Sequence, residues 1–306
     1  MKYIPTSELI QEELKQIVKR YSKQSDGYSS GYPDLDQSLS GGFEVGKLYC
    51  IGSNNGVGRT MVALNILVKQ LKNIASKDVL VFVSTGTSRP VILQKILAIA
   101  LEIDLIKIQT GNLSEEELSK LNSDPFINQL KSNQLIIIED RSPSLIDLEE
   151  VMNTLIADSF VPKMLFIDQI QDMQHTDKTI NREQAVYRLL KDIKVMALQV
   201  GVSVLFTSNV SKRVHYRKDS KIPKLDDLLD SRLIGDISDY CFMVLRPNFY
   251  QVPGDSDAEV FLEELHLVCK KNQNLPLDTI VFATELKKHL LLNAPNYIIN
   301  QHIQNL

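Results

Sequence analysis

The chain has 306 residues, of which 43% are hydrophobic and 24% are charged, and its formal net charge is −4 at pH 7. This mixture is typical of a globular protein, and the net charge means that affinity for nucleic acid must come from a local patch of cations. No apolar run approaches the length of a signal peptide or a membrane span, so we expect a cytoplasmic protein without a membrane partner. Three cysteines without metal-ligand spacing lie in apolar runs that read as strands, which predicts buried free thiols at Cys50, Cys241 and Cys269.

The N-terminal segment is predicted to form one helix over residues 6–23, with Ser7 as its N-cap. Apolar residues recur along it at helical spacing: Leu9, Ile10, Leu14, Ile17, Val18 and Tyr21. The small polar stretch SKQSDGYSSG follows and predicts a flexible linker, so we divide the chain into a helix and linker (1–30) and a main domain (31–306). Two interpretations of the apolar stripe remain open: it folds back on its own domain, or it packs on a neighbouring subunit.

The main domain alternates short β-rich runs with longer helical runs, beginning with a strand at 47–53, a helix from about Gly58 to 73, a strand at 78–85 and a helix at 89–103. A single further helix is predicted over residues 114–130, where Ser114 and Glu117 fit a capping box. The next strands are nearly unbroken apolar runs, which indicates a parallel sheet with helices on both faces; they lie at 134–140, 163–169 and 202–209. Four closely spaced strands predict an antiparallel extension at the C-terminal end: 239–246, 258–270, 278–284 and 289–293.

The stretch GSNNGVGRT at residues 52–60 connects the first of these strands to a helix. Glycines such as Gly56 and Gly58, followed by a helix N-terminus, can turn backbone N–H groups toward a phosphate. The phosphate-loop pattern GxxxxGK[ST] is matched at two of its four places, because they are occupied by Ser53, Gly58, Arg59 and Thr60. A glycine turn leading into a helix would explain the stretch equally well.

Two polar residues at the ends of later strands add to this pattern. Asp168 ends the strand at 163–169, where a carboxylate can orient the water shell of Mg²⁺ together with the Thr60 hydroxyl. Asn209 ends the strand at 202–209, where it could sense a γ-phosphate. Each residue alone is equally consistent with a loop cap or a turn, but side by side they would outline a nucleotide crevice for ATP and Mg²⁺.

The segment GYPDLDQSLSGGFEVGKLYCIGSNNGVGRTMVALNI resembles the opening of the helicase domain of the DnaB family, the bacterial replicative helicases among the RecA-like ATPases. The similarity continues through MLFIDQIQDM, LIGDISDYCFMVLR and KKNQNLPLDT and covers nearly everything after the linker. The resemblance implies a RecA-like P-loop NTPase core. It also implies that the first helix is the family's linker helix, which docks on the adjacent subunit of a ring.

The departures from the family pattern fall at the residues of its ATPase chemistry. The family's loop lysine corresponds to Arg59, its water-activating glutamate to Gly86, its glutamine sensor to Asn209 and its arginine finger to Gln273, while Lys271 is retained as a nucleotide contact. We also expect no counterpart of the family's primase-contacting N-terminal domain. Arginine-finger loss lowers turnover by about 10³ to 10⁵ and loss of a general base by about 10² to 10⁴ in other enzymes.

A basic run, SKRVHYRKDSKIPK, coincides with the family's DNA-contacting loop. Its cations outnumber the single acid Asp219 and are Lys212, Arg213, Arg217, Lys218, Lys221 and Lys224. A cationic loop can hold single-stranded DNA without reading its sequence, and Tyr216 could stack on a base. The alternative is a solvated loop without a ligand, as most charge runs are.

Two functional hypotheses follow from these residues. In the first, the chain is a hydrolysis-deficient DnaB-like paralogue that binds single-stranded DNA or a DnaB-type helicase ring, in self-association or a mixed ring, as an accessory, loader or inhibitor. In the second, it is an active minimal ATP-dependent 5′–3′ helicase with a reworked site that has recruited Glu139, Asp140 or Asp172. A third hypothesis is a nucleotide-gated switch in which bound ATP only orders the subunit interface.

Overall fold

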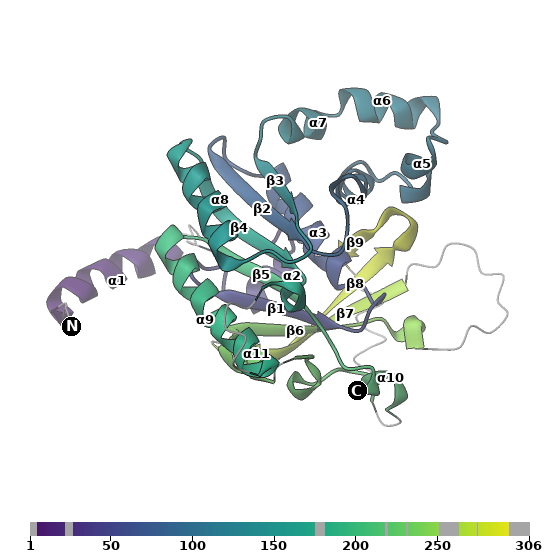
Figure 1. Cartoon of the computed structure of the whole chain (residues 1–306). Coiled ribbons are helices and arrows are strands. Elements are labelled where there is room, and N and C mark those ends of the chain that lie inside the picture. Colours follow the sequence, from purple (N-terminus) through teal and green to yellow (C-terminus); the bar gives the residue numbers. More distant parts are fainter. Residues whose placement is uncertain are drawn as a thin grey trace.

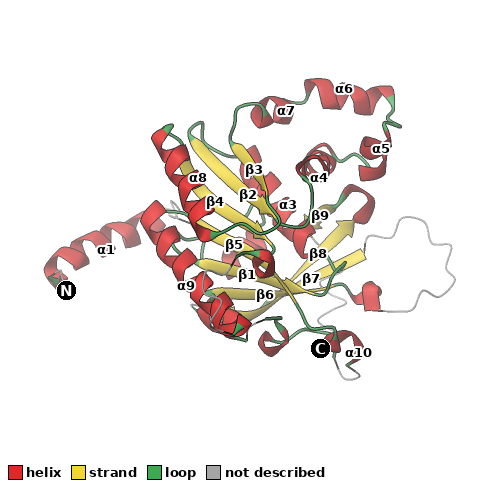
Figure 2. Ribbon diagram, viewed as in Figure 1, coloured by secondary structure: helices red, strands yellow, loops and turns green. Residues whose placement is uncertain are grey.

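The computed structural model describes residues 5–21, 27–174, 181–217, 220–230, 232–250, 263–273 and 275–293. Their strands form one nine-stranded sheet in the order β3-β2-β4-β5-β1-β6-β7-β8-β9 (Figures 1 and 2). The strands are β1 Leu48–Ser53, β2 Asp78–Ser84, β3 Leu135–Glu139, β4 Val161–Asp168, β5 Ser203–Asn209, β6 Tyr240–Leu245, β7 Glu263–Asn272, β8 Thr279–Glu285 and β9 Leu290–Asn293. The part of residues 258–270 that precedes β7 lies outside the described residues.

The sheet has a parallel part and an antiparallel part, as predicted. Strands β3, β2, β4, β5, β1 and β6 pair in parallel, and β7, β8 and β9 continue the sheet as antiparallel neighbours. The boundary differs from the prediction, because the run at 239–246 forms β6, which pairs in parallel with β1. This strand is buried along its whole length, as expected for a position inside the sheet.

Helices cover both faces of the sheet and bury a core on each side (Figure 1). One core includes apolar residues of α2 (Pro33–Ser38), α3 (Arg59–Lys72) and α4 (Arg89–Leu101), and the other those of α8 (Leu145–Ala157), α9 (Arg182–Val200) and α11 (Leu233–Ile237). The remaining helices are α1 Thr6–Tyr21, α5 Leu105–Thr110, α6 Glu115–Ser123, α7 Pro125–Leu130 and α10 Arg213–Tyr216, with short 3₁₀ turns η1 Ile170–Asp172, η2 Leu225–Asp227, η3 Pro247–Tyr250 and η4 Leu286–Lys288. The three free cysteines are buried in the sheet, as predicted, and burial raises the pKa of the Cys50 thiol.

Local chemistry explains where the helix predictions held and where they were wrong. The capping box of Ser114 and Glu117 is present, but the helix predicted over 114–130 ends at Ser123. Asp124 takes an extended conformation and caps α7, whose first residue is Pro125; a proline cannot continue the preceding helix. Helix α1 begins at Thr6, so Ser7 lies inside the helix and is not its N-cap.

The linker predicted to be flexible is anchored to the main domain in its second half. Tyr28 pairs with Phe43 through two backbone hydrogen bonds of 2.8 Å, and the Ser30 N–H donates to the Asp36 carboxylate at 2.7 Å. Residues 22–26 lie outside the described part. Before them, α1 extends to one side of the molecule, and its apolar side chains are about half exposed or more: Leu9, Ile10, Leu14, Ile17 and Val18 (Figure 1). These five side chains of the stripe are therefore not covered by the part of the main domain that the structure describes.

The buried Asp239 carboxylate ties β6 to β1 and to α9. It accepts the Leu48 N–H at 2.8 Å and the Lys194 ammonium at 2.8 and 2.9 Å, and only 1% of Asp239 is exposed. We expect Asp239→Ala to lower the free energy of unfolding by about 3 kcal/mol, because it leaves a buried N–H and a cation unpaired. Urea denaturation measures this loss. The control Asp192→Ala, at an exposed position of α9, should change stability by less than about 0.5 kcal/mol.

Candidate functional site

The predicted site residues lie at the carboxyl ends of three adjacent parallel strands. Ser53 ends β1, Asn209 ends β5 and Asp168 ends β4, and the sheet order places β5 between the other two. Open α/β sheets bind their ligands in the crevice outside such strand ends. The structure thus brings together residues that are up to 156 positions apart in the chain, from Ser53 to Asn209.

The stretch 53–60 has the backbone of a phosphate loop leading into a helix. Gly56 and Gly58 have φ angles of +82° and +129°, which side chains with a β-carbon rarely adopt. A β-carbon at Gly58 would also lie only 3.2 Å from the Leu265 side chain. Helix α3 begins at Arg59, so its first N–H groups and its dipole are available to an anion.

The Asp168 carboxylate lies between two threonine hydroxyls. Thr60 Oγ1 donates to it at 2.9 Å, and Thr207 Oγ1 donates at 2.6 Å. A hydroxyl and a carboxylate in contact at the start of the helix are the donor set with which P-loop proteins hold Mg²⁺ beside a bound phosphate. Thr60 and Asp168 therefore fit a nucleotide-bound Mg²⁺. Among the described residues there is no cluster of three acidic, histidine or cysteine side chains that would hold a metal ion alone.

The Arg59 side chain is held by neutral oxygen acceptors. Its Nη2 donates to Gln169 Oε1 at 2.7 Å and to Asn55 Oδ1 at 3.2 Å, and its Nη1 donates to the Ser53 carbonyl at 3.2 Å. Burial lowers the pKa of Arg59, and the nearby carboxylates of Asp168 and Asp172 act in the opposite direction. Its buried Nε finds no hydrogen-bond partner in the part of the chain that the structure describes. Both terminal nitrogens of the guanidinium thus donate hydrogen bonds to other residues of the chain.

Asp172 belongs to a polar network around Gln169. Its Oδ2 accepts from Thr85 Oγ1 at 2.8 Å and from Gln169 Nε2 at 2.9 Å, and Asn209 Nδ2 donates to Gln169 Oε1 at 2.7 Å. Gly86 follows Thr85 directly, and a β-carbon at Gly86 would meet nothing within 4 Å. A larger side chain therefore fits at position 86.

The other two carboxylates considered as replacements are engaged elsewhere. Glu139 accepts the Arg89 backbone N–H at 2.9 Å at the start of α4, and Asp140 accepts the Ser142 N–H at 2.9 Å. Asp172 is accordingly the candidate that contacts the network at the strand ends.

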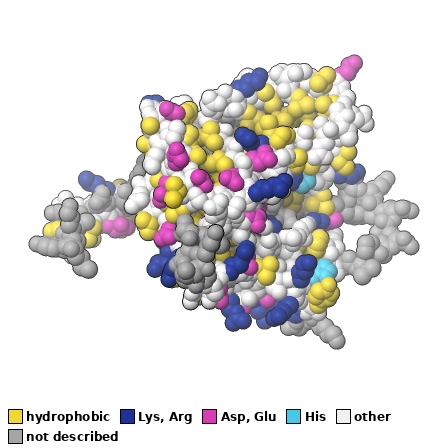
Figure 3. All heavy atoms as spheres, viewed as in Figure 1, with side chains coloured by type: hydrophobic (Ala, Val, Ile, Leu, Met, Phe, Trp, Pro, Cys, Tyr) yellow, Lys and Arg dark blue, Asp and Glu magenta, His cyan; other side chains and the backbone are white. Residues whose placement is uncertain are grey.

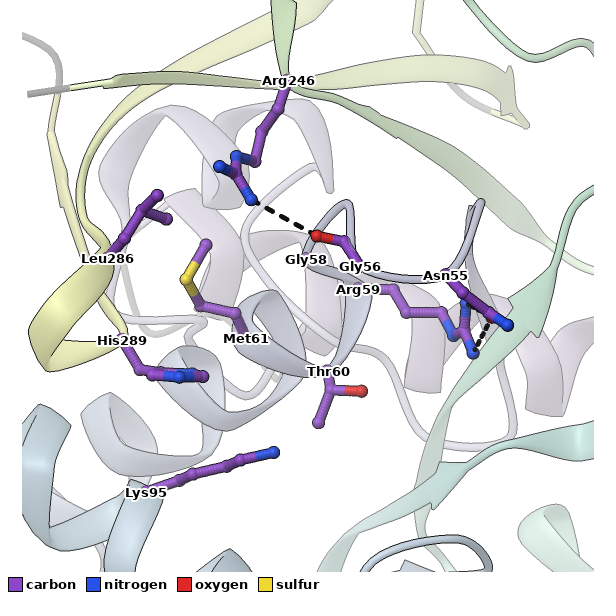
Figure 4. A pocket seen from close by; sticks show the side chains of 10 residues that line it. All are labelled: Asn55, Gly56, Gly58, Arg59, Thr60, Met61, Lys95, Arg246, Leu286 and His289. Carbon is purple, nitrogen blue, oxygen red and sulfur yellow. Dashed lines mark hydrogen bonds between the residues drawn. The ribbon is translucent and has the colours of Figure 1, made fainter. Parts of the chain in front are cut away.

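A cavity of about 520 Å³ opens beside the loop and α3 (Figure 4). Four of the residues predicted to bind a nucleotide line it, namely Gly56, Gly58, Arg59 and Thr60, whereas Ser53 is not part of its lining. The sequence reasoning missed three basic residues that also line it, which are Lys95, Arg246 and His289. Only Lys95 interrupts the otherwise uncharged run between Arg89 and Leu101 in α4, and that isolated charge was the available signal.

The three basic residues differ in their charge and in whether their side chains are already hydrogen-bonded within the protein. Burial lowers the pKa of Lys95, partly offset by the Asp168 carboxylate, and the Lys95 ammonium points into the cavity in Figure 4. Burial and the proximity of Lys95 lower the pKa of His289, which favours its neutral form. Arg246 is anchored, because its Nη2 donates to Glu263 at 2.6 Å and its Nη1 to the Gly56 carbonyl at 3.3 Å. The cavity thus presents one free ammonium, among the residues described, to an anion.

The basic run contains both internal and exposed cations. The Arg217 guanidinium donates to both Asp227 carboxylate oxygens at 2.6 and 2.8 Å, and Lys221 donates to the His215 carbonyl at 2.7 Å. These two residues shape the loop. Lys212, Arg213 and Lys224 are exposed, and Lys218 with Asp219 lies outside the described residues. Basic, hydrophobic and histidine side chains lie together over α10 (Figure 3).

Two residues of the family pattern lie away from the cavity. The Lys271 ammonium donates to the carbonyls of Gly235 and Asp236 at 2.9 and 2.6 Å, near the end of α11. Gln273 is exposed and accepts from Lys47 at 3.1 Å. A contact between Lys271 and a nucleotide stays a prediction. Because Lys271 lies away from this cavity, the nucleotide would have to be bound to another subunit.

The sheet order, the phosphate loop and the Thr60–Asp168 pair define a RecA-like P-loop domain. A family model for the DnaB-like helicase C terminal domain matches residues 27–290, and the chain belongs to this family. The predicted fold class and family resemblance are both confirmed. No helix among the described residues is long and apolar enough to cross a bilayer.

Individual relatives agree with this assignment. The chain is 29% identical to a probable replicative DNA helicase of Trieres chinensis, over 83% of this chain and 54% of that protein. It is 26% identical to the replicative DNA helicase DnaB of Rickettsia prowazekii, over 89% of this chain and 59% of that protein. The chain thus spans between half and two thirds of these relatives. A solved DnaB-like replicative helicase superposes with a TM-score of 0.80 at 19% identity, covering 96% of this chain and 68% of that chain, which supports the fold alone.

Lys95 yields a prediction about anion binding in the cavity. We expect Lys95→Ala to weaken binding of tripolyphosphate by about tenfold or more, as for loss of a charge-assisted hydrogen bond. The wild-type affinity should fall as pH rises through the lowered pKa of Lys95, below the ordinary value of 10.5, because the ammonium loses its charge. Isothermal titration calorimetry across pH measures both effects. Lys95→Arg should remove this pH dependence, and Lys107→Ala, at the ion pair with Glu117, should change nothing.

Proposed function

We propose that the chain is a DnaB-like protein of DNA replication that binds ATP with Mg²⁺ but does not turn it over as a motor. The observation that carries this proposal is the position of the Arg59 guanidinium, which is engaged by Gln169, Asn55 and Ser53. The family's loop lysine corresponds to this residue. A planar guanidinium fixed by three acceptors does not replace a mobile ammonium at the phosphates.

Several features of the cavity support binding of the nucleotide. The backbone of Gly56 to Gly58 and the start of α3 are shaped for a phosphate, and Lys95 supplies a positive charge. Thr60 and Asp168 would hold Mg²⁺, which, when bound, neutralises charge on the phosphates. The nucleotide would then act as a ligand that orders the site and the adjacent subunit interface. It would not be hydrolysed to drive movement.

The absent side chains argue against efficient hydrolysis. At Gly86 there is no carboxylate to activate water, and at Gln273 there is no guanidinium to lend to a neighbouring site. Each such loss lowers turnover by orders of magnitude in other enzymes, about 10² to 10⁴ for a general base and about 10³ to 10⁵ for an arginine finger.

Asp172 favours a second candidate function, an active ATP-dependent helicase with a relocated carboxylate. It contacts Thr85 and Gln169 at the same strand ends as Asp168. In this alternative, Asp172 would orient or deprotonate the attacking water in place of a residue at position 86.

Phosphate release from ATP–Mg²⁺ with and without single-stranded DNA, beside a fluorescent-nucleotide titration, separates the two functions. We expect saturable binding that Asp168→Asn and Lys95→Ala weaken. We also expect turnover of about 10⁻³ s⁻¹ or slower, the range of P-loop sites without an arginine finger.

DNA-stimulated turnover that Asp172→Asn abolishes would establish the helicase alternative. Asp140→Asn serves as the matched control, since the Asp140 carboxylate contacts only the Ser142 N–H among the described residues. If neither nucleotide binding nor turnover is detected, the loop 53–60 is a structural turn and the proposal fails.

The exposed stripe of α1 supports association with a second RecA-like subunit. Leu9, Ile10, Leu14, Ile17 and Val18 are 48%, 49%, 53%, 49% and 66% exposed. Burying such a stripe removes apolar surface from water and is the main driving force for a helix to dock. The partner we propose is another copy of this chain or a DnaB-type helicase subunit in a mixed ring.

The single-stranded DNA would lie along the exposed cations Lys212 and Arg213.

Analytical ultracentrifugation tests the role of the α1 stripe, alone and with a DnaB-type helicase. We expect Leu14→Glu to reduce association by at least tenfold, because it places a charge in the apolar contact. The control Lys15→Glu introduces the same side chain one position along the helix and off the stripe. If both variants associate like the wild type, α1 does not form the contact.

A further inference from the structure

A second cavity, of about 300 Å³, lies on the other side of the phosphate loop. It is formed where the end of β5, helix α10 and the turn η3 meet the loop. Its volume is at the lower end of the range of small-molecule sites, about 300 to 1,000 Å³. Its lining combines amides, one ammonium and aromatic rings, and includes Asn55, Asn209, Lys212, His215, Tyr216 and Phe249.

The aromatic side chains form a connected group that spans two elements. The His215 ring lies 5.7 Å from that of Tyr216, 6.2 Å from that of Phe249 and 5.3 Å from that of Tyr250. The rings of Phe249 and Tyr250 lie 5.2 Å apart at 82°. The group therefore fixes α10, which carries the exposed cations, against η3.

Tyr216 is at the open end of this group, and 80% of its surface is exposed. An aromatic ring held in water on a scaffold of other rings offers a flat face to a ligand. Lys212 lies one turn before it in the same basic segment and also lines the cavity.

The two asparagines in the polar wall of the cavity differ in whether their side chains can still bind a ligand. Asn54 is committed, because its Nδ2 donates to the Val210 carbonyl at 3.2 Å and its Oδ1 accepts from Tyr250 at 3.2 Å. The Asn55 Oδ1 accepts from Arg59, while its amide nitrogen donates to no atom among the residues described. That N–H₂ group can donate to an acceptor on a ligand.

We propose that this cavity takes one unstacked nucleobase of single-stranded DNA whose phosphates follow Lys212 and Arg213. The inference rests on the proposed binding of single-stranded DNA and adds a base-stacking site to it. Aromatic rings stack on every base, so the site needs no sequence preference. An ammonium at the rim meets the backbone phosphate beside the stacked base. The net charge of −4 makes such a local combination necessary for binding DNA at all.

Fluorescence anisotropy with two oligonucleotides of equal charge tests the site. One is oligothymidylate of about 16 nucleotides, the upper end of typical single-strand sites, and the other is an abasic strand of the same length. We expect the wild type to bind oligothymidylate at least about fivefold more tightly, the lower bound for stacking of one base. Tyr216→Ala should remove this difference, and Tyr216→Phe, which keeps the ring, should retain it.

Salt dependence separates stacking from phosphate contact. Tyr216→Ala should weaken binding at each salt concentration without changing the slope of log K against log salt. Lys212→Ala should weaken binding of both oligonucleotides and reduce that slope by about 0.7, the value for one phosphate of a single strand. Circular dichroism would verify that Tyr216→Ala folds, which its exposure leads us to expect.

The outcomes distinguish this inference from the proposed function. If neither oligonucleotide binds, the proposed DNA binding itself is wrong. If both bind equally and Tyr216→Ala has no effect, DNA binding stands and the base site is overturned. If Tyr216→Ala weakens the binding of ATP instead, the cavity takes the base of the nucleotide. If it weakens only association with a DnaB-type helicase, the cavity takes a protein side chain. Either of the last two results overturns the proposal.

Discussion

The Asp168 carboxylate, held between the Thr60 and Thr207 hydroxyls, is the contact around which the site is arranged. It exists because β4, β5 and β1 are parallel and end at one edge of the sheet. The phosphate loop leaves β1 at that edge and starts α3, which brings Thr60 to the carboxylate. The buried Asp239 supports this arrangement from the opposite end of the sheet, because it fixes the start of β1.

The positive charges of the site are divided between two roles. Arg59 occupies the position of a phosphate-binding lysine, yet its planar group is satisfied by amide and carbonyl oxygens at the strand ends. Lys95 reaches the cavity from α4 with a single ammonium. A guanidinium with several donors is easily fixed by neutral acceptors, whereas an ammonium on a flexible stem can follow an anion. This difference in geometry is the physical argument for our proposal that the chain binds a nucleotide without turning it over.

The two cavities on either side of the phosphate loop share one side chain, Asn55. Asn55 contacts the Arg59 guanidinium on one side and lines the aromatic cavity on the other. Any ligand that moves this amide alters the acceptors of Arg59, and thermodynamic linkage makes such an effect reciprocal. The network that joins Asp172, Gln169 and Asn209 contacts the same guanidinium, because Arg59 also donates to Gln169. The proposed nucleotide site and the proposed base site are thus adjacent, with Asn55 between them.

The sequence by itself determined the strands, the parallel core, the buried cysteines and the phosphate loop, because apolar runs and glycine spacing are local signals. It also placed Ser53, Asp168 and Asn209 at strand ends. Only the tertiary structure decided which cations face the cavity. It engages Arg217 and Lys221 within the basic loop and brings Lys95, Arg246 and His289 to the phosphate loop. The contacts of Arg217 and Lys221 are local but need the folded shape of the loop. Lys95, Arg246 and His289 come from elements far from residues 53–60 in the chain, and their meeting follows from sheet order and helix packing, which no local pattern encodes.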